Sequence, residues 1–430
     1  YVQDGGNIEF SDNSVLNSDN SFLIVLGGGS IILSGDGTNS ILNESSFVVD
    51  GGNIEYHDNK IIFFESSTFN INSGDFLTYD NAIFEMTAQS SGSVTGGNFI
   101  LRDSSYVNMI EEAMITISGG NVEMYDFGKI TMENSYINVS GTDSSSGSFL
   151  LRNSVSISLD SSSISVTGGD FESLDSVVAT SNESTISVSS GSLTFDDFTS
   201  YTGISSSVSV SGGNLNLQGQ TEWSMTTSTA IVSGGNLNLF DDSTTSLDLS
   251  TFDVTGGNIN ILSNADLSIS ISTLRVSGGD INHGGESTFD AISSEITITS
   301  GKIVYEDFSV VSIFNTAILI NNEILQFKKD ADPIEIGDLM IFGDNAYGHI
   351  FGASTLDLTE GNFVLVDTSS ALIEDTIITI NGGNLENKEN ASLVFNRVSI
   401  SLIDGSLRAI DSSNIEFNDN TNVSINGGLL

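Results

Sequence analysis

The 430-residue sequence contains no cysteine and a single proline, Pro333. The absence of cysteine excludes disulfides and thiolate metal sites, and it gives no indication of the redox compartment. Because proline cannot donate to a sheet ladder, its scarcity is consistent with a chain made almost wholly of strands. No apolar run approaches the roughly 20 residues that a membrane-spanning helix needs, so no membrane span is expected in this segment.

Basic residues are also scarce. The sequence has 11 Lys and Arg against 56 Asp and Glu, which gives a formal net charge of −45 at pH 7. Binding to nucleic acid depends on Lys and Arg that neutralise phosphates, and docking on anionic lipid needs the same charges. We therefore expect no nucleic-acid partner. A surface of this charge repels copies of itself or collects divalent cations.

What the sequence does contain is one repeated unit. Residues 210–217 and 232–239 both read VSGGNLNL, and residues 254–261 read VTGGNINI, so the unit returns every 22 residues. Such self-similarity at a fixed period is the signature of a repeat architecture. The residue that follows the Gly-Gly pair, or its equivalent, marks 19 copies, and most steps between copies are 22 or 23 residues. The markers are Asn7, Ser30, Asn53, Asp75, Asn98, Asn121, Ser148, Asp170, Ser192, Asn214, Asn236, Asn258, Asp280, Lys302, Glu323, Asn362, Asn384, Ser406 and Leu429.

Within each copy the apolar residues alternate with polar ones. Leu237 and Leu239 form one alternating pair, and Phe252 and Val254 form another before the next Gly-Gly. A period of two predicts strands. Three short strands cannot pair within one copy, so each must pair with its equivalent in the next copy. The sequence therefore predicts an all-β fold: a right-handed parallel β-helix solenoid with three strands per 22–23 residue coil and about 19–20 coils.

The repeat is interrupted most strongly between Glu323 and Asn362, where the step is 39 residues. We therefore expect β-helix coils over residues 1–327, an irregular insertion over 328–355 and further coils over 356–430. The insertion holds the residues whose chemistry differs from the rest of the chain, and they form a predicted contact surface. These are Lys328, Lys329, Asp330, Asp332 and His349.

The repeat resembles known β-helical families. Its period and its three strands per coil are similar to the right-handed parallel β-helix (pectate-lyase-like) superfamily, which includes polysaccharide lyases, phage tailspikes and surface adhesins. The Gly-Gly-x-Ile/Leu signature resembles the repeats of polymorphic outer-membrane-protein adhesins, whose usual form is Gly-Gly-Ala-Ile/Leu. This chain has Asn, Asp or Ser in place of the Ala, and no regular Phe-x-x-Asn partner motif. The resemblance implies an extracellular or cell-surface protein.

Stacked polar residues are expected to form ladders. Asn side chains at the marker position, about 4.8 Å apart, can pair their amides up and down the column. This predicts a structural ladder of Asn7, Asn53, Asn98, Asn121, Asn214, Asn236, Asn258, Asn362 and Asn384.

A second polar column stands five residues after the marker and is mostly Asp. Its carboxylates could hold Ca²⁺ weakly between coils, and the alternative is a solvated row of Asx turns. The clearest candidates are Asp58, Asp80, Asp103 and Asp126.

Other surface features have less specific interpretations. The strand before Gly-Gly carries outward Ser and Thr, as in Ser165/Thr167 and Ser187/Ser189, which could be solvated surface, a glycan contact or an ice- or mineral-binding face. His57 and His283 fall at expected corners and are predicted to lie on the surface. Five Asn-x-Ser sequons are candidate glycosylation sites if the chain is secreted by a eukaryote. They begin at Asn43, Asn138, Asn182, Asn390 and Asn422.

These observations favour a non-enzymatic, extracellular structural or adhesive β-solenoid rod. We expect it to be part of a longer surface or fibre-forming protein, with partners that are further coils, copies stacked end to end, or glycans. No cofactor is expected beyond the Ca²⁺ considered above. The alternative is a carbohydrate-active enzyme, a polysaccharide lyase or hydrolase, with its site near residues 328–355.

Overall fold

The computed structural model describes residues 6–35, 40–141, 147–300, 370–427 and 429–430, and between 302 and 365 it describes the strands alone. For residues 298–362 only the backbone is described. The described residues form strands and turns, with no helix among them. The chain divides into an N-terminal unit, Tyr1–Leu215, and a C-terminal unit, Asn216–Leu430.

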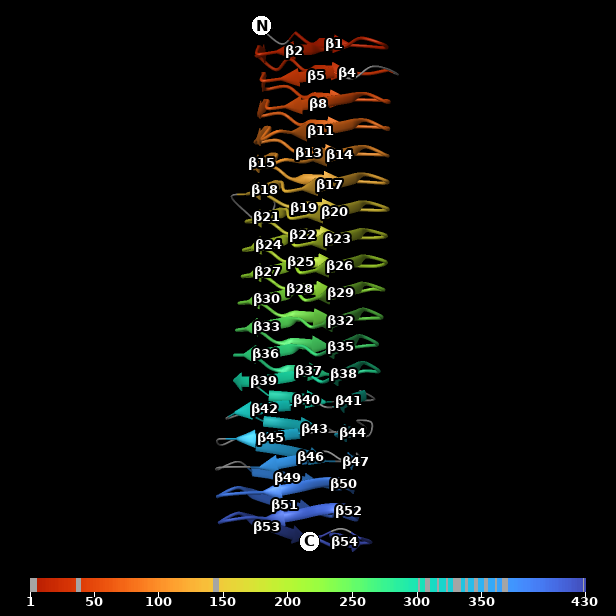
Figure 1. Ribbon diagram of the computed structural model, residues 1–430, viewed down its shortest axis with the longest axis vertical. Coiled ribbons are helices and arrows are strands. Elements are labelled where there is room, and N and C mark those ends of the chain that lie inside the picture. The colour runs from red at the N-terminus through yellow and green to blue at the C-terminus, as the bar shows by residue number, and fades with distance from the viewer. Residues whose placement is uncertain are drawn as a thin grey trace. The chain divides into compact units, whose positions relative to one another are not determined.

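Each coil of the N-terminal unit has three strands, as predicted (Figure 1). The first strands, which follow the Gly-Gly corner, are β1 (Ile8–Phe10), β4 (Ile31–Leu33), β7 (Ile54–Tyr56), β10 (Phe76–Thr78), β13 (Phe99–Leu101), β16 (Val122–Met124), β19 (Phe149–Leu151), β22 (Phe171–Ser173) and β25 (Leu193–Phe195). The second strands are β2 (Asn17–Asp19), β5 (Ser40–Asn43), β8 (Ile61–Glu65), β11 (Ile83–Thr87), β14 (Tyr106–Met109), β17 (Lys129–Glu133), β20 (Ser156–Asp160), β23 (Val178–Asn182) and β26 (Ser200–Ile204). The third strands are β3 (Phe22–Val25), β6 (Ser46–Asp50), β9 (Thr68–Asn72), β12 (Ser91–Thr95), β15 (Met114–Ser118), β18 (Tyr136–Ser140), β21 (Ser163–Thr167), β24 (Thr185–Ser189) and β27 (Ser207–Ser211).

The C-terminal unit continues the same order after β28 (Leu215–Leu217), which spans the division. Its strands are β29 (Glu222–Thr226), β30 (Thr229–Ser233), β31 (Leu237–Leu239), β32 (Thr244–Asp248), β33 (Thr251–Thr255), β34 (Ile259–Ile261), β35 (Asp266–Ser270), β36 (Thr273–Ser277), β37 (Ile281–His283), β38 (Thr288–Ile292), β39 (Glu295–Ser300), β40 (Lys302–Tyr305), β41 (Val310–Phe314), β42 (Ala317–Asn321), β43 (Ile324–Phe327), β44 (Ile334–Ile336), β45 (Leu339–Gly343), β46 (Tyr347–Phe351), β47 (Thr355–Thr359), β48 (Asn362–Leu365), β49 (Ser370–Glu374), β50 (Ile377–Asn387), β51 (Ser392–Asn396), β52 (Ser399–Ala409), β53 (Asn414–Asn418) and β54 (Asn422–Ile425).

Each described strand pairs with its equivalents in the neighbouring coils, and the pairing is parallel. In the N-terminal unit, for example, β24 pairs on one side with β21 and on the other with β27, in a register that aligns Ile164, Ile186 and Val208. All three side chains are buried, so one column of the core passes through them. The predicted all-β parallel solenoid with three strands per coil is therefore confirmed.

The two glycines of the corner are required for different reasons. Gly212 has a φ of 91°, a left-handed conformation, and Ser190 takes the same place in the preceding coil with a φ of 69°. Gly213 cannot be replaced in this way, because a Cβ there would lie 2.0 Å from the carbonyl oxygen of Gly191 in the coil before. The first glycine provides a backbone conformation, and the second allows two corners to stack in contact.

Where side chains are described, the interior of the coils is filled mainly by aliphatic and aromatic residues. In the N-terminal unit Phe76 and Phe99 stack with ring centroids 4.7 Å apart, and Phe149 stacks on Phe171 at 4.9 Å. The rings repeat at the coil spacing because the parallel register places equivalent residues directly above one another. This continuous apolar column supplies the burial that the short strands lack individually.

Residues 328–355, which the sequence sets apart, contain strands β44, β45 and β46 in the C-terminal unit. β46 pairs with β43, and β45 pairs with β48, which follows the next Gly-containing corner. Five strands, β43 to β47, thus lie between two markers that normally enclose three. The corner consequently moves to a different edge of the coil: in β50 and β52 it joins the second and third strand columns into one continuous strand.

Candidate functional site

The marker column forms a ladder, although its bonds differ from those we predicted. In the N-terminal unit the backbone N–H of Asp75 donates to Asn53 Oδ1 at 3.1 Å, and the N–H of Asn121 donates to Asn98 Oδ1 at 3.0 Å. Each bond joins a side-chain oxygen to the backbone of the next coil, instead of amide to amide. Because only an acceptor oxygen is needed, Ser and Asp serve as well: Asn53 N–H donates to Ser30 Oγ at 3.1 Å.

Most of the other predicted ladder residues that are described fit this scheme. Acceptors of the same kind, each bonded to the next marker, are Asn7, Asn121, Asn236 and Asn258. Asn214 donates its own N–H to Ser192 Oγ at 3.1 Å. Asn384 Oδ1 accepts from the Ser406 hydroxyl, and the side chain of Asn362 lies outside the described residues.

A true amide ladder exists two residues further along, and the sequence analysis missed it. In the C-terminal unit Asn238 Nδ2 donates to Asn216 Oδ1 at 2.8 Å, and the bonds from Asn260 and Asn282 to the preceding amide oxygen are 2.7 and 2.8 Å. These residues lie on the outer face of the first strands. The signal that could have found this ladder is Asn at the same place in four successive copies, at positions 216, 238, 260 and 282.

A buried serine ladder at the corner between the second and third strands was also missed. In the C-terminal unit the N–H of Ser228 donates to Ser250 Oγ at 3.0 Å, and the N–H of Ser250 donates to Ser272 Oγ at 2.9 Å. The Ser250 hydroxyl in turn donates to the Asp248 carbonyl at 2.7 Å. The residue before each serine is left-handed, even when it is the β-branched Ile271 with a φ of 48°. The ladder bonds therefore stabilise a left-handed backbone conformation at this corner that the side chains themselves disfavour.

The Asp column has a structural use in this fold. Asp58, Asp80, Asp103 and Asp126 all have φ values between 58 and 65°, a conformation that Asp tolerates better than most residues. Asp80 Oδ2 accepts the N–H of Asp58 at 3.2 Å, and Asp103 Oδ2 accepts the N–H of Asp80 at 3.3 Å. Among the described residues no three acidic or histidine side chains lie close enough to hold a metal ion. The geometry gives the predicted Ca²⁺ site no support.

The Ser/Thr face is regular in the N-terminal unit. β21, β24 and β27 align Ser165, Ser187 and Ser209 in one row and Thr167, Ser189 and Ser211 in the next. These side chains lie on the outer surface and are half-buried or exposed. Next to this face, on the second strands, a shallow hollow of about 340 Å³ is lined by Ser158, Leu159, Asp160, Thr180, Ser181, Asn182, Thr202 and Ile204.

The five sequon asparagines all lie on the outer surface, and none of them is buried. Asn43 and Asn182 end second strands and donate their amides to Asp19 and Asp160 of the preceding coil, each at 2.8 Å. Asn138 lies on the outer face of β18 and is half-buried, whereas Asn390 lies in a turn and Asn422 begins β54, both exposed.

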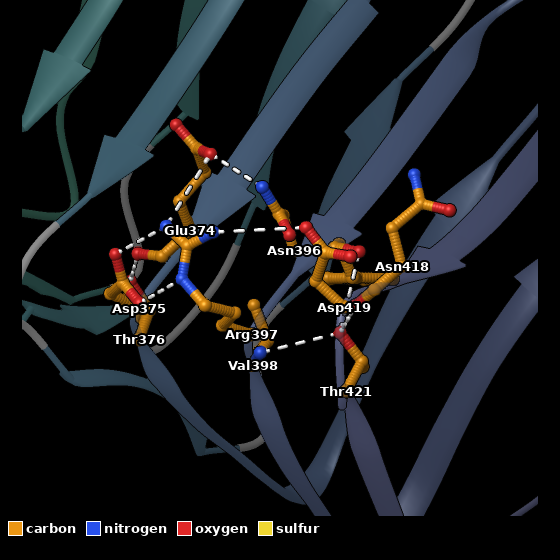
Figure 2. Close-up of polar contacts among 10 residues, drawn as sticks. Glu374, Asp375, Thr376, Asn396, Arg397, Val398, Asn418, Asp419 and Thr421 are labelled. Carbon is orange, nitrogen blue, oxygen red and sulfur yellow. Dashed lines mark hydrogen bonds and ion pairs between the residues drawn. The ribbon is translucent and has the colours of Figure 1, made fainter.

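The side chains of the predicted contact surface in the insertion lie outside the described residues. Lys328, Lys329, Asp330 and Asp332 lie outside the described residues, and only the backbone of His349 is described, in β46. One group of charged residues that is described in the C-terminal unit surrounds Arg397, at the corner that follows β51 (Figure 2).

Arg397 makes a bidentate ion pair with Asp375 of the preceding coil. Its Nε and Nη2 atoms donate to the two carboxylate oxygens at 2.6 and 2.7 Å, and Glu374 and Asp419 lie within 4.0 Å of the same guanidinium (Figure 2). Hydrogen bonding to Arg397 lowers the pKa of the Asp375 carboxyl. The group is exposed, so the pair fixes the corner locally without making a reactive site.

His283 and Lys60 are both buried in the core. His283, predicted to lie on the surface, is fully buried because it points into the core at the end of β37, where the preceding coil has Ile261. Burial lowers the pKa of His283 to about 4. Lys60, in the N-terminal unit, is 1% exposed and donates to the carbonyls of Asp12 and Ser14 at 2.7 and 3.0 Å. His57 is half-buried and stacks on Tyr79 at 4.6 Å.

No protein-family model matches the sequence, and no curated protein matches it. Within the part of the chain that the structure describes, no helix has the length and apolarity required to cross a membrane. The structure establishes a parallel β-solenoid, consistent with a β-helix fold.

Proposed function

We propose that the chain is an extracellular structural and adhesive solenoid, a segment of a larger surface or fibre-forming protein. The observation that supports this proposal is the set of hydrogen bonds that the polar columns make between coils. Marker Asn, corner Asp and corner Ser, which could have formed sites, bond instead to the backbone of a neighbouring coil: Asn to the coil after it, and Asp and Ser to the coil before. A chain that devotes its repeated polar residues to coil-to-coil bonds is suited to act as a stiff support.

The repeat pattern supports the same proposal. The Gly-Gly-x-Ile/Leu signature resembles that of the polymorphic outer-membrane-protein adhesins, and the three-strand coil is similar to the pectate-lyase-like superfamily, in which surface adhesins also occur. The net charge of −45 favours a well-separated, hydrated surface over self-association. We further propose that its partners are glycans or further coils of the same kind.

Adhesion can be tested with beads that carry the whole chain at controlled density. We expect these beads to be retained under flow on surfaces coated with cell-wall or extracellular-matrix glycans, and beads carrying an unrelated protein of equal charge to wash off. Antibody labelling of intact source cells should find the protein outside the membrane. Absence of retention on every surface, together with labelling only after permeabilisation, contradicts the proposal.

The same preparations should be assayed for new reducing or unsaturated chain ends after incubation with polysaccharides. Release of such ends in proportion to protein concentration would replace the structural proposal with a carbohydrate-active enzyme. We expect none, since a support should bind polysaccharide without cleaving it.

A further inference from the structure

Two phenylalanines occupy an outer corner of the N-terminal unit where other coils have small polar residues. The position follows the corner Asp, and Phe127 and Phe198 are 69% and 63% exposed there. The same position in the remaining coils between residues 54 and 204 is polar and exposed: Asn59, Asn81, Ser104, Ser154 and Ser176. A phenylalanine so exposed contributes little to the stability of the folded state, so packing does not account for it.

The two rings are held by equivalent turns. Asp126 and Asp197, which precede them, are left-handed with φ values of 65 and 59°. The N–H of Phe127 donates to the Asp103 carbonyl at 2.9 Å, which fixes the turn to the coil before. Three coil steps separate the rings, and at about 4.8 Å per step their backbones stand about 14 Å apart on one line along the coil axis.

The surface between the rings is polar and carries hydroxyl, amide and guanidinium groups. Ser154 and Ser176 continue the line, and Arg152 is exposed two positions before Ser154. Asn153 donates its side-chain amide to Asp126 at 3.0 Å, and Ser176 donates its N–H to the Asn153 carbonyl at 3.0 Å. These bonds fix the corners relative to one another, so the spacing of the two rings is preorganised.

We propose that this line of corners, from Phe127 to Phe198, binds a neutral linear polysaccharide. A pyranose ring presents a face of C–H bonds, which suits the negative face of an aromatic ring, and an edge of hydroxyls, which suits Ser, Asn and Arg. An extended chain of such sugars advances per residue by about one coil step. One sugar would then stack on the ring of Phe127 and another on the ring of Phe198, while the sugars between them face Ser154 and Ser176.

The observations favour a glycan over other occupants. A protein interface buries about 800 Å² on each partner around an apolar centre, whereas here two single rings are separated by hydroxyl-bearing corners. A second copy of the chain, or an anionic polysaccharide, would meet the repulsion of a molecule with a net charge of −45. A neutral sugar chain avoids both difficulties.

This inference rests on the proposed adhesive function, and it is tested by binding of the whole chain to insoluble cellulose, chitin, mannan and β-1,3-glucan. We expect the wild type to sediment with at least one of them. Phe127→Ala and Phe198→Ala should each weaken binding roughly three- to tenfold, the cost of one aromatic stack, and the double variant should lose it. Phe22→Ala, which truncates a phenylalanine 79% exposed at the start of β3, is the matched control and should bind as the wild type does.

The outcomes separate this inference from the proposal on which it rests. If the wild type binds none of the four polysaccharides, or if the folded double variant binds as tightly as the wild type, the inference is wrong. If beads carrying the double variant are still retained on glycan surfaces, adhesion stands and uses another face. Circular dichroism of each variant excludes loss of fold as the cause.

Discussion

Acidification should loosen the core around His283. Its pKa is about 4 in the folded chain against an ordinary value of 6.5, because burial disfavours the charged imidazolium. Below pH 6.5 the unfolded chain therefore takes up a proton that the folded chain excludes. The stability associated with His283 is complete above about pH 6.5, falls with decreasing pH, and is fully lost near pH 4.

The magnitude follows from the size of the shift. Each unit of pKa difference corresponds to about 1.4 kcal/mol, so the whole shift amounts to about 3 kcal/mol, and about 2 kcal/mol of it is already lost at pH 5. The 56 acidic residues complicate a direct measurement, since their partial neutralisation at low pH relieves repulsion and opposes the loss. The informative quantity is thus the difference between the wild type and a variant that has no histidine there.

His283→Ile is the appropriate variant, since Ile261 occupies the equivalent place in the preceding coil. Hydrogen exchange of peptides covering β34 and β37 reports local opening, and comparing the two proteins at the same pH cancels the pH dependence of intrinsic exchange. We expect the protection of the wild type, relative to the variant, to fall between pH 7.5 and 5. Peptides covering β19 and β22 in the N-terminal unit are the internal control. A difference that stays flat across this range would refute the burial argument.

Three further predictions concern the corners. Gly257→Ala should destabilise the C-terminal unit by about 3 kcal/mol or more, because its Cβ would lie 1.8 Å from the Gly235 carbonyl oxygen. Gly256→Ala meets no backbone atom closer than 3.7 Å and should cost about 1–2 kcal/mol, the cost of its left-handed conformation. Equal melting temperatures of the two variants would contradict this assignment of roles. Ser250→Ala removes the acceptor of the Ser228 N–H and should cost about 1–3 kcal/mol in urea unfolding, while Ser250→Thr keeps a hydroxyl acceptor and should be tolerated. Arg397→Gln should raise the pKa of the Asp375 carboxyl toward its ordinary value in an NMR titration, while Arg408→Gln leaves it unchanged.

The architecture could be predicted from the sequence because the repeat is both regular and alternating. A 22-residue period with apolar residues two apart leaves parallel stacking as the only way to pair strands such as β24, and the register aligns Ile164, Ile186 and Val208 as expected. The pairing of the insertion was harder to predict, because 17 additional residues show the length of the segment but not which strands it forms or where they pair. The structure accommodates them as two additional strands, which places the later corners on another edge of the coil.

The polar columns were only partly predictable. Spacing shows which residues stack, but not whether the bond runs between side chains or from side chain to backbone. That depends on which way a corner presents its N–H groups, which is why amide-to-amide bonds were predicted for the marker Asn and missed in the Asn216 column. His283 was misplaced for a similar reason: it alternates with Ile281 and so points inward, but its polarity suggested a surface corner.

The ladders also indicate where this fold can vary. A residue in a ladder column must match the coils before and after it, so a change there alters two sets of bonds. At the outward corner position of Phe127 and Phe198, Asn81 donates its amide to Asn59 of the preceding coil, but the turn itself is held by backbone bonds and by the left-handed Asp before it. Replacement of Ser by Phe there costs the scaffold little and changes what the surface can bind. In a solenoid of this kind, specificity should therefore be sought in outer turn residues that depart from the repeat, and not in the residues that repeat most faithfully.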